Sequence, residues 1–304
     1  MTSSGLRIRA GFALSLVTAL ALSPSPAGAQ PAWPDCSTNY PGDIAPRVTD
    51  AALAADVKEL CYHGFAVAFS GRAPGPISSS HFLTRQRMQA AAQMAAGSGS
   101  GGGTSLHAET RLPPGQRGQM SEFTQSGYTV EQLSSTANMP DMESRGDSET
   151  MANAVPVIAA LVRGPWAAVQ HAVHTLMAEV DVLYIATGSV YGSSGPSARK
   201  AGSVAVPSAL FKALYSPEQG WAAAYICGNT DHPTCQVVNL ATLQSVAGVD
   251  IFPALPDAVK QGQAGSAAAR VIGSFARAFD YRLLSKARRT ALRGRLPSVQ
   301  LHPE

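Results

Sequence analysis

Two histidines have the spacing of a metal-binding pair. His171 and His174 lie three residues apart in a segment with helical periodicity, and this spacing places both imidazoles on one face of a helix. The sequence offers no identifiable third ligand, so the competing interpretation is that both are solvated or packing residues. An acidic group has two similar interpretations, a cation site or a solvated loop: Asp141, Glu143, Asp147 and Glu149. The other histidines considered are interpreted as structural: His63, His81, His107 and His232.

The chain contains four cysteines: Cys36, Cys61, Cys227 and Cys235. An even number in an exported chain indicates disulfides. Of the three possible pairings we predict Cys36–Cys61 with Cys227–Cys235, because this choice closes two short local loops. Buried free thiols are the alternative, and a metal site is less favoured because no C-x-x-C spacing occurs.

The N-terminus has the layout of a secretory signal. Arg7 and Arg9 supply positive charge, residues 10–22 are apolar, and residues 27–29 form a small-residue triplet. The pattern predicts cleavage after Ala29 and a periplasmic or secreted mature chain. An uncleaved anchor is the alternative, although the apolar stretch is short for a membrane span. After cleavage, no stretch is long and apolar enough to span a membrane.

Charge is distributed unevenly along the chain. Residues 257–304 hold nine basic and three acidic side chains, whereas residues 30–256 hold 12 basic and 17 acidic ones. A domain that binds phosphate backbones usually carries a basic surface of its own, and this body is acidic. We expect residues 267–295 to form a basic amphipathic helix. Its candidate roles are binding nucleic acid, lying on an anionic membrane surface, or packing on the acidic face of the body.

The apolar patterning predicts an α+β domain built around an antiparallel sheet. Residues 30–50 are expected to be extended, 71–80 to form a loop, and 97–105 to be a flexible Gly/Ser insertion. Helices are predicted at 51–60, at 84–96 with Thr84 as N-cap, at 165–176, and at 241–246 before Gly248. Strands are predicted at 64–70, 183–187 (stopped by Gly188), 204–206, 211–215 and 222–226.

A series of short motifs resembles one known family. In chain order they are Leu60-Cys61-Tyr62-His63-Gly64-Phe65-Ala66-Val67, Arg111-Leu112-Pro113-Pro114, Ser126-Gly127-Tyr128, Asn138-Met139-Pro140, Ala152-Asn153, Arg163-Gly164-Pro165-Trp166, Ala186-Thr187-Gly188, Val206-Pro207-Ser208 with Phe211-Lys212, and Ile251-Phe252-Pro253. Together they cover roughly residues 36–255 and resemble the DNA/RNA non-specific endonucleases, a ββα-metal (His-Me finger) family. The resemblance implies a ββα-metal nuclease-like fold with a central antiparallel sheet.

The resemblance also implies hydrolysis of phosphodiesters in DNA or RNA. In the family a histidine general base activates water, an asparagine holds Mg²⁺, a glutamate supports the water shell of the metal, and arginines hold the phosphate. The family follows Ser-Gly-Tyr with Asp-Arg-Gly-His, where this chain has Thr129-Val130-Glu131-Gln132. Gln132 therefore stands at the general base, and a neutral amide has no basic nitrogen at pH 7. Val130 stands at the arginine.

The metal positions are substituted as well. Val162 stands at the metal-binding asparagine, and valine offers no oxygen to a hard cation. Gln170 replaces the helical glutamate, and Pro74 lies near the place of a further phosphate-holding arginine. Asn153 matches the family pattern. Glu131 is expected to point to the opposite face of a strand from Gln132, which would make it a poor substitute base.

The substitutions predict a family member without catalysis, and the N-terminal pattern predicts that it is exported. Three hypotheses about its function stay open. The protein binds a nucleic acid or a protein partner without cutting, or it is an active metal-dependent endonuclease with a rearranged site, or it is a structural or interaction protein that has lost nucleic-acid binding too. No cofactor is expected unless the second holds, which would require Mg²⁺. The predicted parts are a signal peptide 1–29, an endonuclease-like domain 30–256 and a basic helical extension 257–304.

Overall fold

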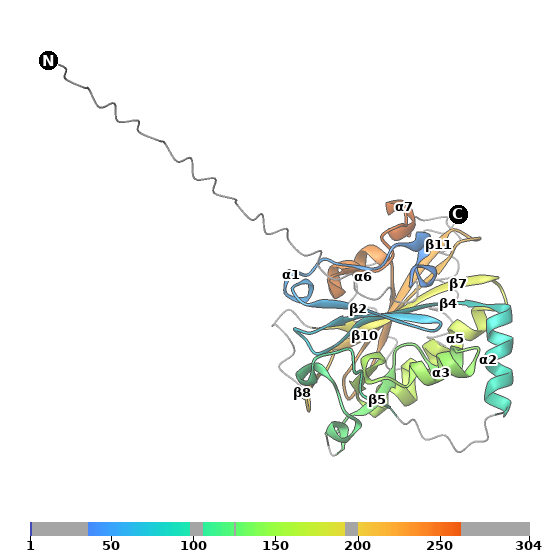
Figure 1. Ribbon diagram of the computed structural model, residues 1–304. Coiled ribbons are helices and arrows are strands. Elements are labelled where there is room, and N and C mark those ends of the chain that lie inside the picture. Colours follow the sequence, from blue (N-terminus) through green and yellow to red (C-terminus); the bar gives the residue numbers. More distant parts are fainter. Residues whose placement is uncertain (2–35, 98–105, 125, 192–199, 263–304) are drawn as a thin grey trace. The chain divides into compact units, whose positions relative to one another are not determined.

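The computed structural model describes residues 36–97, 106–124, 126–191 and 200–262, together with Met1. The elements below all belong to one compact unit, Trp33–Glu304. Its centre is a seven-stranded antiparallel sheet (Figure 1). In sheet order the strands are β12 (Cys235–Val238), β11 (Trp221–Gly228), β10 (Ala209–Ser216), β7 (Val182–Val190), β4 (Gly75–Thr84), β3 (Phe65–Ser70) and β2 (Val57–Tyr62).

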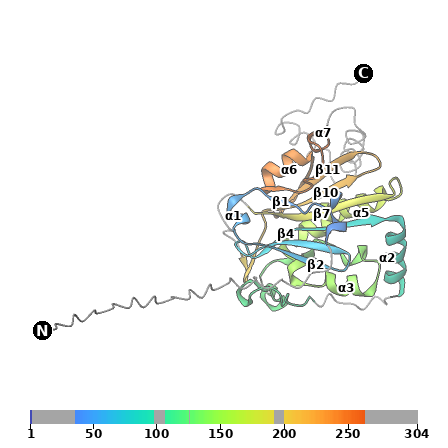
Figure 2. The same cartoon turned by 45° about the horizontal axis from the view of Figure 1, so that its top comes forward.

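Each face of the sheet is covered by a different layer. On one face lie β5 (Thr129–Gln132), β6 (Ala154–Val157), α4 (Ala159–Leu161), the π-helical turn η7 (Val162–Trp166) and α5 (Ala167–Leu176); we call these five elements the ββα layer. On the other face α6 (Leu240–Ala247) packs on β11 and on β13 (Val249–Asp250), which pairs with β1 (Arg47–Val48) (Figure 2). Strand alternation sorts the residues of β10: Leu210 and Leu214 join the core under the ββα layer, whereas Phe211 and Ala213 join the core under α6.

Short elements complete the described part of the chain. They are η1 (Ser37–Asn39), η2 (Pro41–Asp43), α1 (Ala51–Ala54), α2 (Arg85–Gly97), η3 (Pro114–Gln116), η4 (Met120–Phe123), η5 (Thr136–Asn138), α3 (Met142–Ser148), η6 (Met151–Asn153), β8 (Lys200–Ala201), β9 (Val204–Ala205) and α7 (Asp257–Lys260). Two 3-10 turns thus interrupt the stretch 30–50 that was expected to be extended. The predicted helix 267–295 and the predicted signal peptide lie outside the described residues.

The predicted helix 51–60 is wrong beyond its first turn. Asp50 caps α1 by accepting hydrogen bonds from the backbone N–H groups of Ala52 and Leu53, and the chain then turns into β2. All six residues of β2 pair with β3, and Gly64, at φ +83°, allows the tight turn between them. Pairing along the sheet edge therefore outweighs the helical periodicity.

The predicted loop 71–80 is also wrong over most of its length. Residues from Gly75 onward form β4, which lies between β3 and β7. Ser78, Ser79 and Ser80 are at most 1% exposed. Composition suggested a loop because serine is usually a surface residue, but here small polar side chains fill a strand that is covered on both faces.

The predicted helices 84–96, 165–176 and 241–246 are confirmed as helical segments, with small shifts of their ends. The Thr84 hydroxyl accepts the backbone N–H of Arg87 at the start of α2, as an N-cap does. Gly248 ends α6 in the left-handed conformation, at φ +66°. The predicted strands 64–70, 183–187, 204–206, 211–215 and 222–226 correspond to β3, β7, β9, β10 and β11.

Both predicted disulfides are present. Cys36–Cys61 joins the residue before η1 to β2, and Cys227–Cys235 joins directly paired positions of β11 and β12. Each disulfide therefore involves one edge strand of the sheet, β2 or β12. Among the described residues, no helix has the length and apolar character needed to cross a membrane.

Gly188 does not end its strand, contrary to the prediction, because β7 continues through it to Val190. A Cβ atom built on Gly188 would lie 2.3 Å from the backbone oxygen of Ile77 and 2.3 Å from Cζ of Phe211. The glycine is therefore required by the close approach of β4 and by the ring that packs over β7.

We expect Gly188→Ala to destabilise the fold by about 1–3 kcal/mol, because the added methyl overpacks this contact. Urea unfolding measures the change. Gly146→Ala is the matched control: nothing lies within 4 Å of a Cβ there, and in helix α3 alanine should be neutral or stabilise by up to about 1 kcal/mol. Equal stabilities for the two variants would contradict the close-packing argument.

Candidate active site

The ββα layer holds four of the positions that the family resemblance singled out: Val130, Gln132, Val162 and Gln170. Strand β5 pairs antiparallel with β6, so that Gln132 lies opposite Ala154 and Thr129 opposite Val157. The chain continues from β6 through α4 and η7 into α5. Within η7, Gly164 has non-helical dihedrals (φ −111°, ψ −112°) and is followed by Pro165, which explains the irregular turn at the start of the helix.

Both the nitrogen and the oxygen of the Gln132 amide make hydrogen bonds. Its Nε2 donates to the backbone oxygen of Ser148 at 2.9 Å, and its Oε1 accepts from the Thr136 hydroxyl at 3.0 Å. Gln132 therefore ties the end of α3 and the turn η5 to strand β5. Its side chain has a structural role at the position where the family resemblance places a proton acceptor.

Asn153, the residue that matches the family pattern, is fully buried and supports the same tie. Its Oδ1 accepts the backbone N–H of Ser134 at 2.9 Å, and its Nδ2 donates to the backbone oxygens of Ser134 at 2.8 Å and Ser148 at 3.0 Å. The backbone oxygen of Ser148 thus accepts hydrogen bonds from both Gln132 and Asn153. The two amides fix how the segment 133–148 lies on β5.

The donor set does not fit a magnesium site. Val162 offers no oxygen, Val130 packs against a buried apolar cluster, and the Oε1 of Gln132 already accepts a hydrogen bond from Thr136. Pro74, near the place of a family arginine, accepts the N–H of Ala205 with its backbone oxygen. Mg²⁺ requires several oxygen ligands in near-octahedral order, and these positions do not provide them.

Glu131 has contacts that the sequence did not predict. As predicted, its side chain points to the opposite face of β5 from that of Gln132, and on that face it reaches η7 and α5. Its Oε1 accepts the indole N–H of Trp166 at 2.8 Å and the Nε2 of Gln170 at 3.5 Å. Burial raises the pKa of the Glu131 carboxyl, against the hydrogen bond from Trp166 and the charge of Lys212, which lower it.

Lys212 lies in the core beneath Glu131. It is 1% exposed, and its Nζ donates to the Thr187 hydroxyl at 2.6 Å and lies 5.4 Å from the centre of the Trp166 ring. Burial lowers the pKa of Lys212 to about 8, with the charge of Glu131 acting in the opposite direction. The motif Phe211-Lys212 contributed to the family resemblance, but no sequence pattern predicted that this lysine would be buried.

A chain of hydrogen bonds runs from α5 into the sheet. Nε2 of His174 contacts Oδ1 of Asn138 at 2.9 Å, and Nδ2 of Asn138 contacts Nε2 of His81 at 3.2 Å. Nδ1 of His81 contacts the Ser134 hydroxyl at 3.0 Å, and that hydroxyl also accepts from Ser79. Because an amide nitrogen only donates, this arrangement assigns a neutral His81 with its proton on Nδ1.

The proposed metal pair is not brought together as a site. His174 contacts Asn138, whereas Nδ1 of His171 lies 3.5 Å from the Thr175 hydroxyl. Neither histidine belongs to a group of three metal-ligating side chains within the described part of the chain. His107 lies in an isolated bridge with Thr150, and His232 is exposed.

The acidic group is organised around a helix rather than a loop. Asp141 caps α3 by accepting the N–H of Ser144 at 2.8 Å. Glu143 and Asp147, one turn apart on α3, contact the two ring nitrogens of His63 at 3.2 and 3.0 Å. Glu149 is the C-cap residue of α3. The cluster thus joins α3 to the turn between β2 and β3.

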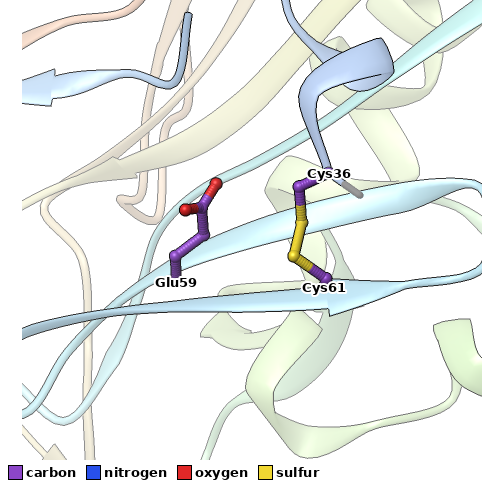
Figure 3. A group of neighbouring side chains, drawn as sticks. All are labelled: Cys36, Glu59 and Cys61. Carbon is purple, nitrogen blue, oxygen red and sulfur yellow. A yellow bond between two sulfur atoms is a disulfide. The ribbon is translucent and has the colours of Figure 1, made fainter. Parts of the chain in front are cut away.

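One group in the described residues has metal-ligand atoms within 4.8 Å of one another: Cys36, Glu59 and Cys61 (Figure 3). The two sulfur atoms are bonded to each other, so neither is a free thiolate for a metal. The Glu59 carboxylate accepts the Tyr40 hydroxyl at 2.6 Å. The group is therefore a disulfide with a hydrogen-bonded carboxylate beside it.

The order strand, strand, helix on one face of an antiparallel sheet defines a ββα nuclease-like fold. The family model described as DNA/RNA non-specific endonuclease matches residues 48–258, and the chain belongs to this family. Among solved structures, the chain is similar to one in a crystal structure of the EndoG/EndoGI complex, which concerns the mechanism of EndoG inhibition. The TM-score is 0.51 and the identity 19%, over 63% of this chain and 84% of that one. A search of curated proteins finds no match. The fold and family predictions are thus confirmed.

The buried His81 should make stability depend on pH. Burial, with the charges of Lys212, Arg87 and His174, lowers the pKa of His81 well below its ordinary value of 6.5. Below pH 6.5 His81 binds a proton in the unfolded chain but not in the folded chain. The free energy of unfolding therefore falls as the pH falls, by up to about 1.4 kcal/mol per pH unit. We expect His81→Gln to flatten the slope of unfolding free energy between pH 7 and 5.

The exposed His232→Gln is the matched control and should keep the slope of the natural chain. Urea midpoints measured at closely spaced pH values give the comparison. An unchanged slope in the His81 variant would show that His81 titrates normally in the folded protein.

Proposed function

We propose that this protein is an exported member of the endonuclease family that does not cleave nucleic acid and acts as a binding module. The observation that carries the proposal is the Gln132 amide, both ends of which are hydrogen-bonded to the neighbouring chain. A neutral amide has no basic nitrogen at pH 7, so it cannot take a proton from water. Loss of a general base costs about 10²–10⁴ in rate.

The metal side of the site supports the same proposal. Valine at 162 and glutamine at 170 leave no carboxylate at the two positions that the family resemblance assigns to the metal. A metal Lewis acid contributes several kcal/mol to such reactions. The two losses are not additive, but either one alone makes efficient hydrolysis inaccessible. We therefore propose that the chain uses no metal cofactor.

The charge distribution favours a protein partner over a phosphate backbone. The body, residues 30–256, is acidic, and Val130 and Pro74 stand where the resemblance implies arginines. Backbone-binding domains depend on such cations. The similar EndoG structure is of a complex with EndoGI, so a related fold has been seen with a protein partner. Nucleic-acid binding, where it occurs, is assigned to the basic residues of 257–304.

Export is proposed from two independent features. Residues 1–29 have the pattern of a secretory signal, and all four cysteines are paired in disulfides, which persist in oxidising compartments. We propose a periplasmic or secreted protein made of the domain 30–256 and the basic extension 257–304.

A specific observation favours a second candidate, an active nuclease with a rearranged site. Glu131 places a carboxylate against Gln170, the position of the helical glutamate of the family, and burial raises its pKa toward the range useful for proton transfer. This candidate is weaker because Trp166 and Gln170 both donate to the same carboxylate oxygen.

We expect residues 30–304 to cleave neither supercoiled DNA nor RNA. With Mg²⁺ or Mn²⁺, the amount of cleaved nucleic acid should not exceed that seen with chelator. A variant carrying Thr129→Asp, Val130→Arg, Glu131→Gly, Gln132→His, Val162→Asn and Gln170→Glu should gain chelator-sensitive cleavage, because it restores the base and the metal ligands. Gel electrophoresis of the products measures both.

The restored variant with Ala at position 132 is the matched control and should lose at least about 10²-fold of the gained rate. Chelator-sensitive cleavage by the natural chain would overturn the proposal. Loss of that cleavage in Glu131→Gln would then support the second candidate.

The binding prediction concerns the basic extension. We expect residues 30–304 to bind duplex DNA no more tightly than about 10⁻⁶ M at physiological salt, with affinity falling steeply as salt rises. Replacing Arg288, Arg289, Arg293 and Arg295 by alanine should remove most of this binding, whereas Arg72→Ala with Arg163→Ala on the body should not. Fluorescence anisotropy measures affinity and salt slope. Tight, salt-insensitive binding that survives the four replacements would contradict the assignment.

A further inference from the structure

Two ionisable side chains lie between the central sheet and the ββα layer. Glu131 belongs to β5, and Lys212 belongs to β10 in the sheet. Lys212 is 1% exposed, so contact with a substrate or partner does not explain why a charged side chain lies there. Burying a lysine costs free energy unless something compensates its charge, so the compensation must be identified.

Trp166 connects the two charges. The N–H edge of its indole donates to Oε1 of Glu131 at 2.8 Å, while the centre of the ring lies 5.4 Å from Nζ of Lys212. A ring presents a positive edge and a negative face, so the indole is oriented to favour a carboxylate at its edge and an ammonium over its face. The orientation of one side chain therefore suits both charges at once.

The two charged side chains are held by different elements of the fold. Glu131 is held by Trp166 at the end of η7 and by Gln170 in α5, one helical turn apart. Lys212 is held by the hydroxyl of Thr187, its direct cross-strand neighbour on β7. The carboxylate thus fastens a strand to a helix within the ββα layer, and the ammonium belongs to the sheet below.

We propose that Glu131, Trp166 and Lys212 form a charge-coupled lock that holds the ββα layer on the central sheet, with the lysine supplying the buried positive charge and no divalent cation taking part. The lock is independent of whether the chain cleaves nucleic acid. Its competitor is a lysine anchored by Thr187 alone, to which Glu131 would contribute nothing.

The two models differ in how Lys212 holds its proton. Burial lowers the pKa of Lys212 to about 8, while its ordinary value of 10.5 applies to the unfolded chain. Between these values the unfolded chain carries the proton and the folded chain does not, so stability rises with pH in this window relative to a variant without the lysine. The nearby His81 and His174, whose pKa values are lowered, titrate below the window. Burial raises the pKa of Tyr225 from its ordinary value of 10.0, so this group affects stability only at the alkaline end of the window.

The experiment compares unfolding free energies from pH 6 to pH 10 for residues 30–304 and three variants. Lys212→Met should lose the alkaline rise. In Glu131→Gln, which keeps an oxygen for the indole N–H but removes the charge, the rise should begin about one pH unit lower, a tenfold weaker proton affinity. The exposed Glu179→Gln loses one negative charge elsewhere and should leave the onset unchanged.

A direct titration keeps the proposal testable if Glu131→Gln fails to fold. The Cε and Nζ resonances of Lys212 in the natural chain should titrate near pH 8, and adding Mg²⁺ or chelator should change neither this midpoint nor the thermal unfolding temperature. The same onset in the natural chain and in Glu131→Gln would overturn the lock, as would stabilisation of the natural chain by Mg²⁺ or an ordinary titration of Lys212.

Discussion

The structure depends on satisfying polar groups that are buried between the central sheet and the ββα layer. Ser79, His81 and Lys212 project from the sheet into a space from which water is largely excluded, and a buried polar group without a partner costs about 1–3 kcal/mol. Ser134 and Asn138, in the segment that follows β5, contact His81, and Trp166 of the ββα layer lies over Lys212. This layer can therefore pack in few other registers, because a shift by one residue would leave several buried groups unsatisfied.

That constraint bears on how the scaffold of a nuclease family can be kept when residues of its site are substituted. A catalytic base needs a free nitrogen and a metal needs free oxygens, and such groups contribute little to packing. At Gln132 both amide ends are hydrogen-bonded, and at Val162 the side chain is apolar. Residues that suit function commonly reduce stability, and replacing them commonly restores it. The fold and the chemistry rest on different atoms, so either can be altered while the other is kept.

Sequence reasoning succeeded where the deciding interactions are local. Thr84, Gly248 and the disulfide Cys227–Cys235 act within a few residues of the chain, and each was predicted correctly. It failed where distant partners decide. Residues 57–60 become a strand because β3 pairs with them, and Ser78 lies in the sheet because β7 approaches it. The positions that differ from the family motif are inferred from motif order alone and stay a prediction. The contact of Glu131 with Trp166 could not be inferred in that way, because it depends on where the helix packs on the sheet.

The position of Glu131 also bears on the proposed loss of catalysis. In the family motif a glycine stands there, and a longer side chain must be accommodated under the strand. Here it meets a donor in Trp166 and an opposite charge in Lys212, both of which belong to motifs shared with the family. A carboxylate is tolerated at this depth only because those groups are present. The substitution thus adds an interaction to the core beside the positions, Gln132 and Val162, that differ from the family motif. Under the proposed function, reversing it alone would remove a stabilising contact and would not restore catalysis.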